Sequence, residues 1–422
     1  HMRRALKSLK EFPFVEMAQR VLEKHFVEGG RSPEKDFKLI PMYTINPPKS
    51  LMELTVLGSY VEVWLAKEGH KGLVGINFLE KIQMPTLAAL YGALLAGVDY
   101  VLVGAGIPLT IAEIIDDLIA GKAVKLEITV EGALKDEKTY CYFDPQEFCG
   151  GNAPVLKRPM FLAIISSATL AQVLARKSKG KVNGFIVEGA TAGGHNAPPR
   201  GQMQLNDRGE PVYGERDTPD LIKIAAEGLP FWLAGSFGEP GKLKEALSLG
   251  AVGIQVGTAF AYCDESGMDP EIKKQVIEKS LAGTLEVFTD PLASPTGFPF
   301  KVVGVPESMS DLEVYEDRCR VCELGYLRKP YRKADGSIGY RCASEPISDY
   351  EHKGGKTEDT INRKCICGSL TTTINLGSKG DSALVTSGDN VAKKTFFVPL
   401  VEDGKTSYGA AKVVEVLLKD CE

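Results

Sequence analysis

The sequence lacks the features of several broad classes of protein. Ile82–Val98, one of its longest uncharged runs, has 17 residues and is interrupted by Pro85, Gly92 and Gly97, whereas a membrane-spanning helix needs about 20 apolar residues. No apolar segment follows the basic residues near the N-terminus, so no export signal is expected. We therefore expect a soluble, cytoplasmic protein without a membrane partner.

Basic residues are not in excess either. Lys and Arg total 50 against 55 Asp and Glu, which gives a net charge of −5. Proteins that bind nucleic acid through the phosphate backbone present a basic patch, and none stands out here. We therefore expect no nucleic-acid partner. The sequence leaves homo-oligomerisation open.

Nine cysteines among 422 residues are too few for a fold built on disulfides. Five of them cluster late in the chain: Cys319, Cys322, Cys342, Cys365 and Cys367. Four thiolates can hold a tetrahedral zinc ion or an iron–sulfur cluster. However, the spacing matches neither a zinc ribbon nor a ferredoxin. Three interpretations therefore stay open, namely no metal, zinc and iron–sulfur.

Glycine is abundant, and many glycines end short apolar runs. Eight such runs, interleaved with helical patterns, are typical of an α/β protein with parallel strands. They are Phe37–Tyr43, Val61–Leu65, Gly72–Asn77, Tyr100–Gly104, Met160–Ser166, Gly184–Gly189, Phe231–Gly235 and Gly253–Gly257. The pattern predicts a (β/α)8 TIM barrel, whose chemistry is carried at the carboxyl ends of its strands.

The remaining segments suggest additions to this barrel. We expect a helical extension over residues 1–36, the barrel over 37–305, a cysteine-rich segment over 306–372 and a C-terminal segment over 373–422 that closes on the barrel. Alternation of apolar and polar residues over Lys125–Phe143 predicts an inserted β-hairpin.

Three of the predicted strands end in turns suited to binding and catalysis. The sixth is followed by Gly193, Gly194 and His195, so a ligand can approach the backbone closely while an imidazole stands nearby to move a proton. The seventh and eighth are followed by Gly235-Ser236 and Gly257-Thr258, at positions where barrels often bind phosphate. Taken singly, His195 is equally explained as an ordinary loop histidine, and each of the other two turns as an ordinary strand-to-helix turn.

In combination these turns resemble the nitronate monooxygenase family, FMN-dependent TIM barrels related to FMN enoyl-acyl-carrier-protein reductases. The resemblance lies in Val187–His195, Leu233–Gly238 and Leu249–Phe260, and extends over residues 39–301. Its specific part is A-G-G-H (Ala192–His195) combined with the later Q-V-G-T-A-F (Gln255–Phe260). Ser294–Lys301 is similar to the family's segment that returns to the active site after the barrel. The loop after His195 is longer than in many members, and a different turn follows the first predicted strand.

The resemblance implies roles for individual residues. His195 would be the catalytic acid/base or an orienting group. The implied FMN-binding residues are Met42 under the flavin, Asn77 at its polar edge, Gly193 and Gly194 beside the ring, Gln255 near the ring or ribityl chain, and Gly235, Ser236, Gly257 and Thr258 at the phosphate.

The implied function is oxidation of small alkyl nitronates by oxygen, with FMN as cofactor. A second hypothesis is an ene-reductase that uses NAD(P)H to reduce enoyl thioesters. A third is a non-catalytic flavoprotein that senses a metal through its cysteine-rich segment, since a fold alone does not fix a function.

Overall fold

Two sets of three parallel strands organise the chain. The computed structural model describes residues 2–32, 35, 38–378, 380–402, 404–419 and 421. They divide into a first unit (His1–Ala163, Val173–Gly184 and Leu324–Arg341) and a second unit (Ile164–Gln172, Phe185–Glu323 and Cys342–Glu422). No helix in the described part of the chain is long and apolar enough to span a membrane.

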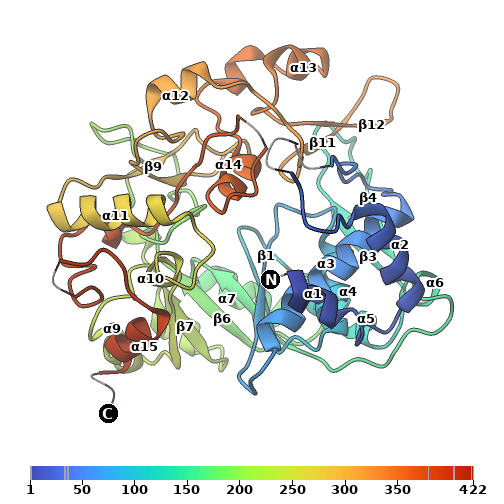
Figure 1. The fold of residues 1–422 in the computed structure, drawn as a ribbon, viewed down its shortest axis with the longest axis horizontal. Helices are drawn as coiled ribbons and strands as arrows, with labels where there is room; N and C mark the ends of the chain where they lie inside the picture. The colour runs from blue at the N-terminus through green and yellow to red at the C-terminus, as the bar shows by residue number, and fades with distance from the viewer. Residues whose placement is uncertain are drawn as a thin grey trace. The chain divides into compact units, whose positions relative to one another are not determined.

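The first unit contains the parallel strands β1, β2 and β5 in that order, with Tyr100 of β2 opposite Gly75 of β1 and Met160 of β5. Figure 1 labels many of the elements along the chain. Those of this unit are α1 (Met2–Ser8), α2 (Val15–His25), α3 (Lys49–Lys67), β1 (Gly75–Leu79), α4 (Thr86–Leu95), β2 (Tyr100–Gly104), α5 (Ile111–Ile119), β3 (Val124–Ile128), β4 (Thr139–Phe143), α6 (Pro145–Phe148), β11 (Lys329–Arg332) and β12 (Ile338–Arg341). Two elements, β5 (Met160–Ile165) and α7 (Ala168–Lys177), have residues in both units.

The second unit contains the parallel strands β6, β7 and β8, followed by helices and an antiparallel pair. Its elements are β6 (Gly184–Glu188), α8 (Leu221–Ala225), β7 (Phe231–Ala234), α9 (Lys242–Ser248), β8 (Gly253–Gln255), α10 (Thr258–Ala261), α11 (Pro270–Ala282), β9 (Val287–Asp290), β10 (Phe300–Val303), α12 (Leu312–Asp317), α13 (Ile347–His352), α14 (Ile366–Thr372) and α15 (Ala410–Leu418). Short 3₁₀ helices span Glu215–Asp217, Thr357–Thr360 and Asp389–Ala392.

Six of the eight predicted strands are present, which confirms a mixed α/β fold with parallel strands. The prediction for Val61–Leu65 is wrong, because this run lies within α3. Val56, Tyr60 and Val63 are buried at the four-and-three spacing of a helix. A short apolar run alone does not distinguish a strand from a buried helix.

The prediction of a strand over Phe37–Tyr43 is also wrong for its described part, Lys38–Tyr43, and Phe37 lies outside the described residues. Side chains, and not a neighbouring strand, provide the hydrogen-bond partners of this backbone. Arg328 Nη2 donates to the carbonyl oxygen of Tyr43 at 2.7 Å, and the amide of Ile45 donates to the hydroxyl of Tyr340 at 2.9 Å. The apolar composition of this run therefore predicted a strand, although its backbone bonds to side chains that are distant in sequence.

β3 and β4 pair antiparallel where the sequence predicts a hairpin, with Leu126 opposite Cys141. The predicted cysteine-rich segment contributes to both units, since β11 and β12 belong to the first and its five cysteines to the second. Ion pairs attach β12 to the loop after β3, where Arg341 Nη2 lies 2.5 Å from a carboxylate oxygen of Glu131.

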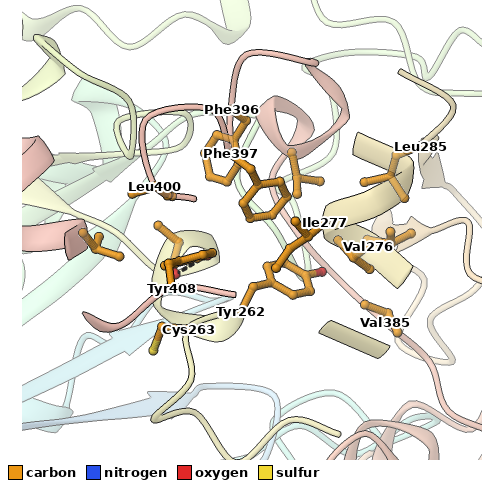
Figure 2. Close-up of a cluster of buried hydrophobic side chains, with 14 of the residues drawn as sticks. Tyr262, Cys263, Val276, Ile277, Leu285, Val385, Phe396, Phe397, Leu400 and Tyr408 are labelled. Carbon is orange, nitrogen blue, oxygen red and sulfur yellow. Dashed lines mark hydrogen bonds between the residues drawn. The ribbon is translucent and has the colours of Figure 1, made fainter. Parts of the chain in front are cut away.

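A hydrophobic core in the second unit supports the helices after β8. Figure 2 shows Phe396 and Phe397 beside Tyr262 and Tyr408. The Phe397 ring centroid lies 5.8 Å from that of Tyr262 and 5.9 Å from that of Tyr408. α15 packs against α9 and α10. The C-terminal part of the chain therefore completes the core beneath the β8 turn.

Replacing Phe397 by alanine should lower the free energy of unfolding by about 3–5 kcal/mol, because the ring is fully buried and would leave a cavity. Its neighbour Val398 is 59% exposed, so Val398→Ala should change stability by less than about 0.5 kcal/mol. Denaturant titration of both variants measures the difference. Equal effects would show that this cluster does not support the unit.

Candidate active site

The strands β6, β7 and β8 end at the same level. Glu188 is opposite Ala234 on the neighbouring strand, and Ala234 is opposite Gln255 on the next. These three residues form a row across the carboxyl ends of parallel strands, the edge at which α/β proteins bind ligands. The small side chain of Ala234 leaves space between two larger polar ones.

A cavity of about 340 Å³ lies at this edge, within the second unit. Seven of the sequence-predicted residues line it: Gly193, Gly194, Gly235, Ser236, Gln255, Gly257 and Thr258. The residues that sequence analysis placed after three separate strands are thus brought together. No lysine or arginine lies among the lining residues, so the polar groups of the lining come from the backbone, from hydroxyls and from Glu188, Gln255 and Asn390.

The turn after β7 is sharp and holds a non-glycine residue in the left-handed region. Gly235 has φ 89° and Ser236 has φ 61°. A Cβ at Gly235 would lie 3.1 Å from the hydroxyl oxygen of Thr191, so only glycine fits. A serine at positive φ costs about 1–3 kcal/mol, and such strain clusters at functional sites.

The row contains a buried acceptor without a partner, on Gln255, and a carboxyl group with a raised pKa, on Glu188. Gln255 Oε1 is buried and has no hydrogen-bond partner among the described residues. Burial raises the pKa of Glu188 to about 7. An unsatisfied buried acceptor costs about 1–3 kcal/mol, so the cavity is built for a polar occupant. Sequence analysis missed Glu188, although it directly precedes the glycine-rich turn.

A segment from near the C-terminus forms another wall of the cavity. We call residues 386–390 the strap; all but Asp389 line the cavity. Its Thr386 Oγ1 accepts from the amide of Gly194 at 2.8 Å, and its Gly388 amide donates to Thr258 Oγ1 at 3.1 Å. The Gly194 amide therefore bonds to the strap.

The strap lies so close to the β6 turn that only glycine fits there. A Cβ at Gly193 would lie 2.7 Å from the carbonyl carbon of Ser387. The amide of Asp389 also donates to the carbonyl oxygen of Thr191 at 3.0 Å. Sequence analysis missed this segment, although a small polar run after Ala383–Val385 resembles the other strand-end turns.

His195 is half-buried and does not line the same cavity. Its Nε2 is 2.7 Å from Ser294 Oγ, which in turn is 2.7 Å from Thr296 Oγ1. Its ring packs edge-on against Phe300, with centroids 4.9 Å apart. Ser294–Lys301 therefore contacts His195, while its predicted place at an active site stays a prediction. The histidine is thus held in one orientation by residues far along the chain.

Met42 and Asn77 belong to the first unit. Asn77 lies in the middle of β1 and is exposed, and Met42 Sδ packs on the backbone of Gly325. The residues lining the cavity of the second unit do not include either one. Their predicted contacts with a cofactor stay predictions.

The cysteine cluster shows no metal site. None of the five is in a disulfide among the described residues, and in the described part of the chain no group of three or more His, Cys, Asp or Glu side chains is placed to hold a metal ion. Burial, reinforced by the neighbouring thiol of Cys322, raises the pKa of Cys342, which favours the neutral thiol. The expectation of zinc or an iron–sulfur cluster has no support in the structure.

Residues 155–292, which contain the ends of β6, β7 and β8, match the family model described as nitronate monooxygenase. The resemblance to nitronate monooxygenases is confirmed.

Two curated relatives match over part of their length. A probable nitronate monooxygenase of Bacillus subtilis is 34% identical over 121 residues, which are 28% of this chain and 32% of that protein. A protein of Mycobacterium tuberculosis, named (3aS,4S,5R,7aS)-5-hydroxy-7a-methyl-1-oxo-octahydro-1H-indene-4-carboxyl-CoA dehydrogenase, is 26% identical over 123 residues, 29% of this chain and 31% of that protein. The matches thus span about a third of these relatives.

Among solved structures, FabK from Thermotoga maritima is similar at a TM-score of 0.45 and 15% identity, over 89% of this chain and 81% of FabK. This likeness is too distant to assign a function.

The nitronate monooxygenase segment contains the β6, β7 and β8 turns, with Glu188 and His195. The strap and Ser294 lie outside it. Residues after the matched segment therefore also line the cavity, in the strap, and contact His195, through Ser294.

Glu188 should make stability depend on pH. Its pKa is about 7 in the folded protein against 4.5 when unperturbed, so the folded state binds the proton more tightly. The free energy of unfolding should therefore fall as pH rises from 4.5 to about 7, by at most roughly 3 kcal/mol.

The variant Glu188→Gln should lack this pH-dependent part of the free energy of unfolding. Denaturant titration of both proteins at about pH 5 and about pH 8 isolates it, because other titrating groups cancel in the comparison. Parallel pH dependence in the two proteins would show that Glu188 is not held in a desolvated site.

Proposed function

We propose that this protein is an FMN-dependent oxidoreductase that oxidises small alkyl nitronates with oxygen. The observation that carries the proposal is the coincidence of the family match with the cavity. Residues 155–292 match nitronate monooxygenases, and the turns within this segment are the ones that line the cavity. The matches span about a third of the first curated relatives, so activity and substrate are inferences from this segment.

The cavity suits a flavin mononucleotide in three respects. Gly257 and Gly194 face open space, since a Cβ at either would meet no atom within 4 Å. The buried Gln255 Oε1 needs a donor, which the imide N–H of a flavin could supply. The turns at Gly235-Ser236 and Gly257-Thr258 present backbone and hydroxyl groups to the cavity, as phosphate binding requires.

We assign the remaining predicted residues by the same resemblance. Gly193 would border the flavin ring, and by the resemblance alone Met42 and Asn77 would also be flavin-binding residues. Residues 37–305 would form the FMN-binding domain. A closed eight-stranded barrel would need two strands besides the six described parallel strands.

His195 would act on the substrate. When bound, FMN supplies the redox chemistry by accepting electrons from the substrate and passing them to oxygen. The protein's part is to hold the substrate and manage protons. The hydrogen bond between Nε2 and Ser294 Oγ and the edge-on packing on Phe300 fix the imidazole, which makes it suited to accept or donate a proton at one position.

An ene-reductase acting on enoyl thioesters with NAD(P)H is the second candidate. The Mycobacterium tuberculosis relative, named as a carboxyl-CoA dehydrogenase, favours a thioester substrate. Anaerobic mixing of the flavin-loaded protein with NADH or NADPH separates the two. A reductase loses its oxidised flavin absorbance, whereas the nitronate oxidase proposed here keeps it until a nitronate is added. The metal-sensing alternative finds no support, because the cysteine cluster shows no metal site.

The protein should release FMN on heating, and Gly257→Leu should weaken FMN binding at least tenfold, because the side chain would occupy open cavity space. Gly257 has φ −109°, so leucine fits its backbone. Gly214, with φ −116° and similar open space, is the matched control, since it is outside the cavity lining. Chromatography and flavin fluorescence provide the readouts. Recovery of FAD, or equal affinity in both variants, would contradict the assignment.

The variant His195→Asn should retain FMN but lose about 10²- to 10⁴-fold in turnover, because it removes proton transfer and leaves the cavity lining unchanged. Alkyl nitronates with oxygen are the first substrates to assay, and enoyl thioesters with NADH the second. Full activity would exclude a role for His195 in the reaction, and loss of flavin would assign it to cofactor retention.

A further inference from the structure

A buried lysine stands behind the strap. Lys301 on β10 is 2% exposed. Its Nζ lies 2.7 Å from Asp389 Oδ1 and donates to Thr289 Oγ1 at 2.6 Å. Removing an ammonium group from water is costly unless it is paired and hydrogen-bonded, and breaking one partner of such a pair is strongly destabilising. The lysine therefore constrains where Asp389, and with it the strap, can lie.

The backbone of the same residue holds the opposite wall. The amide of Lys301 donates to the carbonyl oxygen of Gly194 at 3.0 Å. Its neighbour Phe300 forms an antiparallel bridge with His195. One residue thus contacts the glycine turn through its backbone and the strap through its side chain, and the Gly194 amide bonds to Thr386 of the strap.

A second acidic group lies on the same network. Glu210, in the loop after His195, accepts from the amide of Thr289 at 3.0 Å. Burial raises the pKa of Asp389, the ion pair with Lys301 opposes this rise, and Glu210 adds to it. Asp389 therefore contacts Lys301 Nζ directly, and Glu210 is linked to it through Thr289.

We propose that the strap is a ligand-binding wall of the cavity and that Lys301 is its positioning residue, acting through Asp389. Thr386, Ser387, Gly388 and Asn390 all line the cavity, while Asp389 between them faces Lys301. The identity of the ligand as FMN rests on the function proposed above. The role of Lys301 in holding the strap does not.

The test compares Lys301→Met, Asp389→Asn and the double variant with the wild-type full-length protein. FMN affinity, measured by flavin fluorescence, should fall by about 10- to 100-fold in each single variant, the range typical of coupling between sites. The double variant should bind no more weakly than Lys301→Met, because both changes remove one interaction.

A matched control is Lys353→Met. Lys353 Nζ pairs at 2.7 Å with Glu345, which is 3% exposed, and neither residue lines the cavity. This variant should lose stability but keep the wild-type affinity for FMN. If Lys301→Met fails to fold, Asp389→Asn carries the test, because its side chain is 42% exposed and nearly the same shape.

Hydrogen exchange on protein without FMN gives a readout independent of the cofactor. The amides of Gly388 and Asp389, bonded to Thr258 and Thr191, should exchange at least tenfold faster in Lys301→Met or Asp389→Asn than in Lys353→Met. Unchanged exchange at these amides, or FMN affinity within twofold of wild type in the folded variants, would overturn the proposal. A wild-type protein that binds no FMN would instead refute the proposed function and leave the exchange experiment decisive for the strap.

Discussion

The alignment of three parallel strand ends is the constraint on which the site depends. Because β6, β7 and β8 are in register, Glu188, Ala234 and Gln255 fall in one row, and the turn after each strand starts at the same edge. Each turn needs residues that allow the backbone to bend sharply and leave room for a ligand. Glycine meets both needs, and the strained Ser236 shows that conformational cost is accepted at this edge.

A second constraint is the close approach of the strap to the β6 turn. A side chain at Gly193 would collide with the backbone of Ser387. This contact joins a turn in the middle of the sequence to a segment nearly 200 residues later. The Lys301–Asp389 pair, Thr386 and Thr258 satisfy the polar groups that such packing buries. The cavity is consequently formed by the strand ends together with a segment that follows the family-matched part of the chain.

The sequence predicted the six parallel strands and six of the seven residues that share the cavity, because alternation of apolar runs with glycine turns is a local signal. The seventh residue, Gln255, was implied by the family resemblance. It failed at Val61–Leu65, where a buried helix and a strand look alike over five residues, and at Lys38–Tyr43, where arginine and tyrosine side chains replace a neighbouring strand.

The strap and the positioning role of Lys301 could not be predicted, because both depend on contacts between residues distant in sequence. The cysteine cluster shows that residues close together in the sequence can also mislead the prediction of a site. Its spacing is compatible with a metal site, but proximity in sequence does not fix the positions of the sulfur atoms, and the described residues show no such site.

We propose that the cavity beside β6, β7 and β8 holds the phosphate-bearing part of FMN. A crystal structure of the full chain with FMN would locate the phosphate. We expect it between the Gly235-Ser236 and Gly257-Thr258 turns, with the strap against the cofactor and Gln255 Oε1 accepting a hydrogen bond. A flavin bound elsewhere, with this cavity holding only solvent, would contradict it.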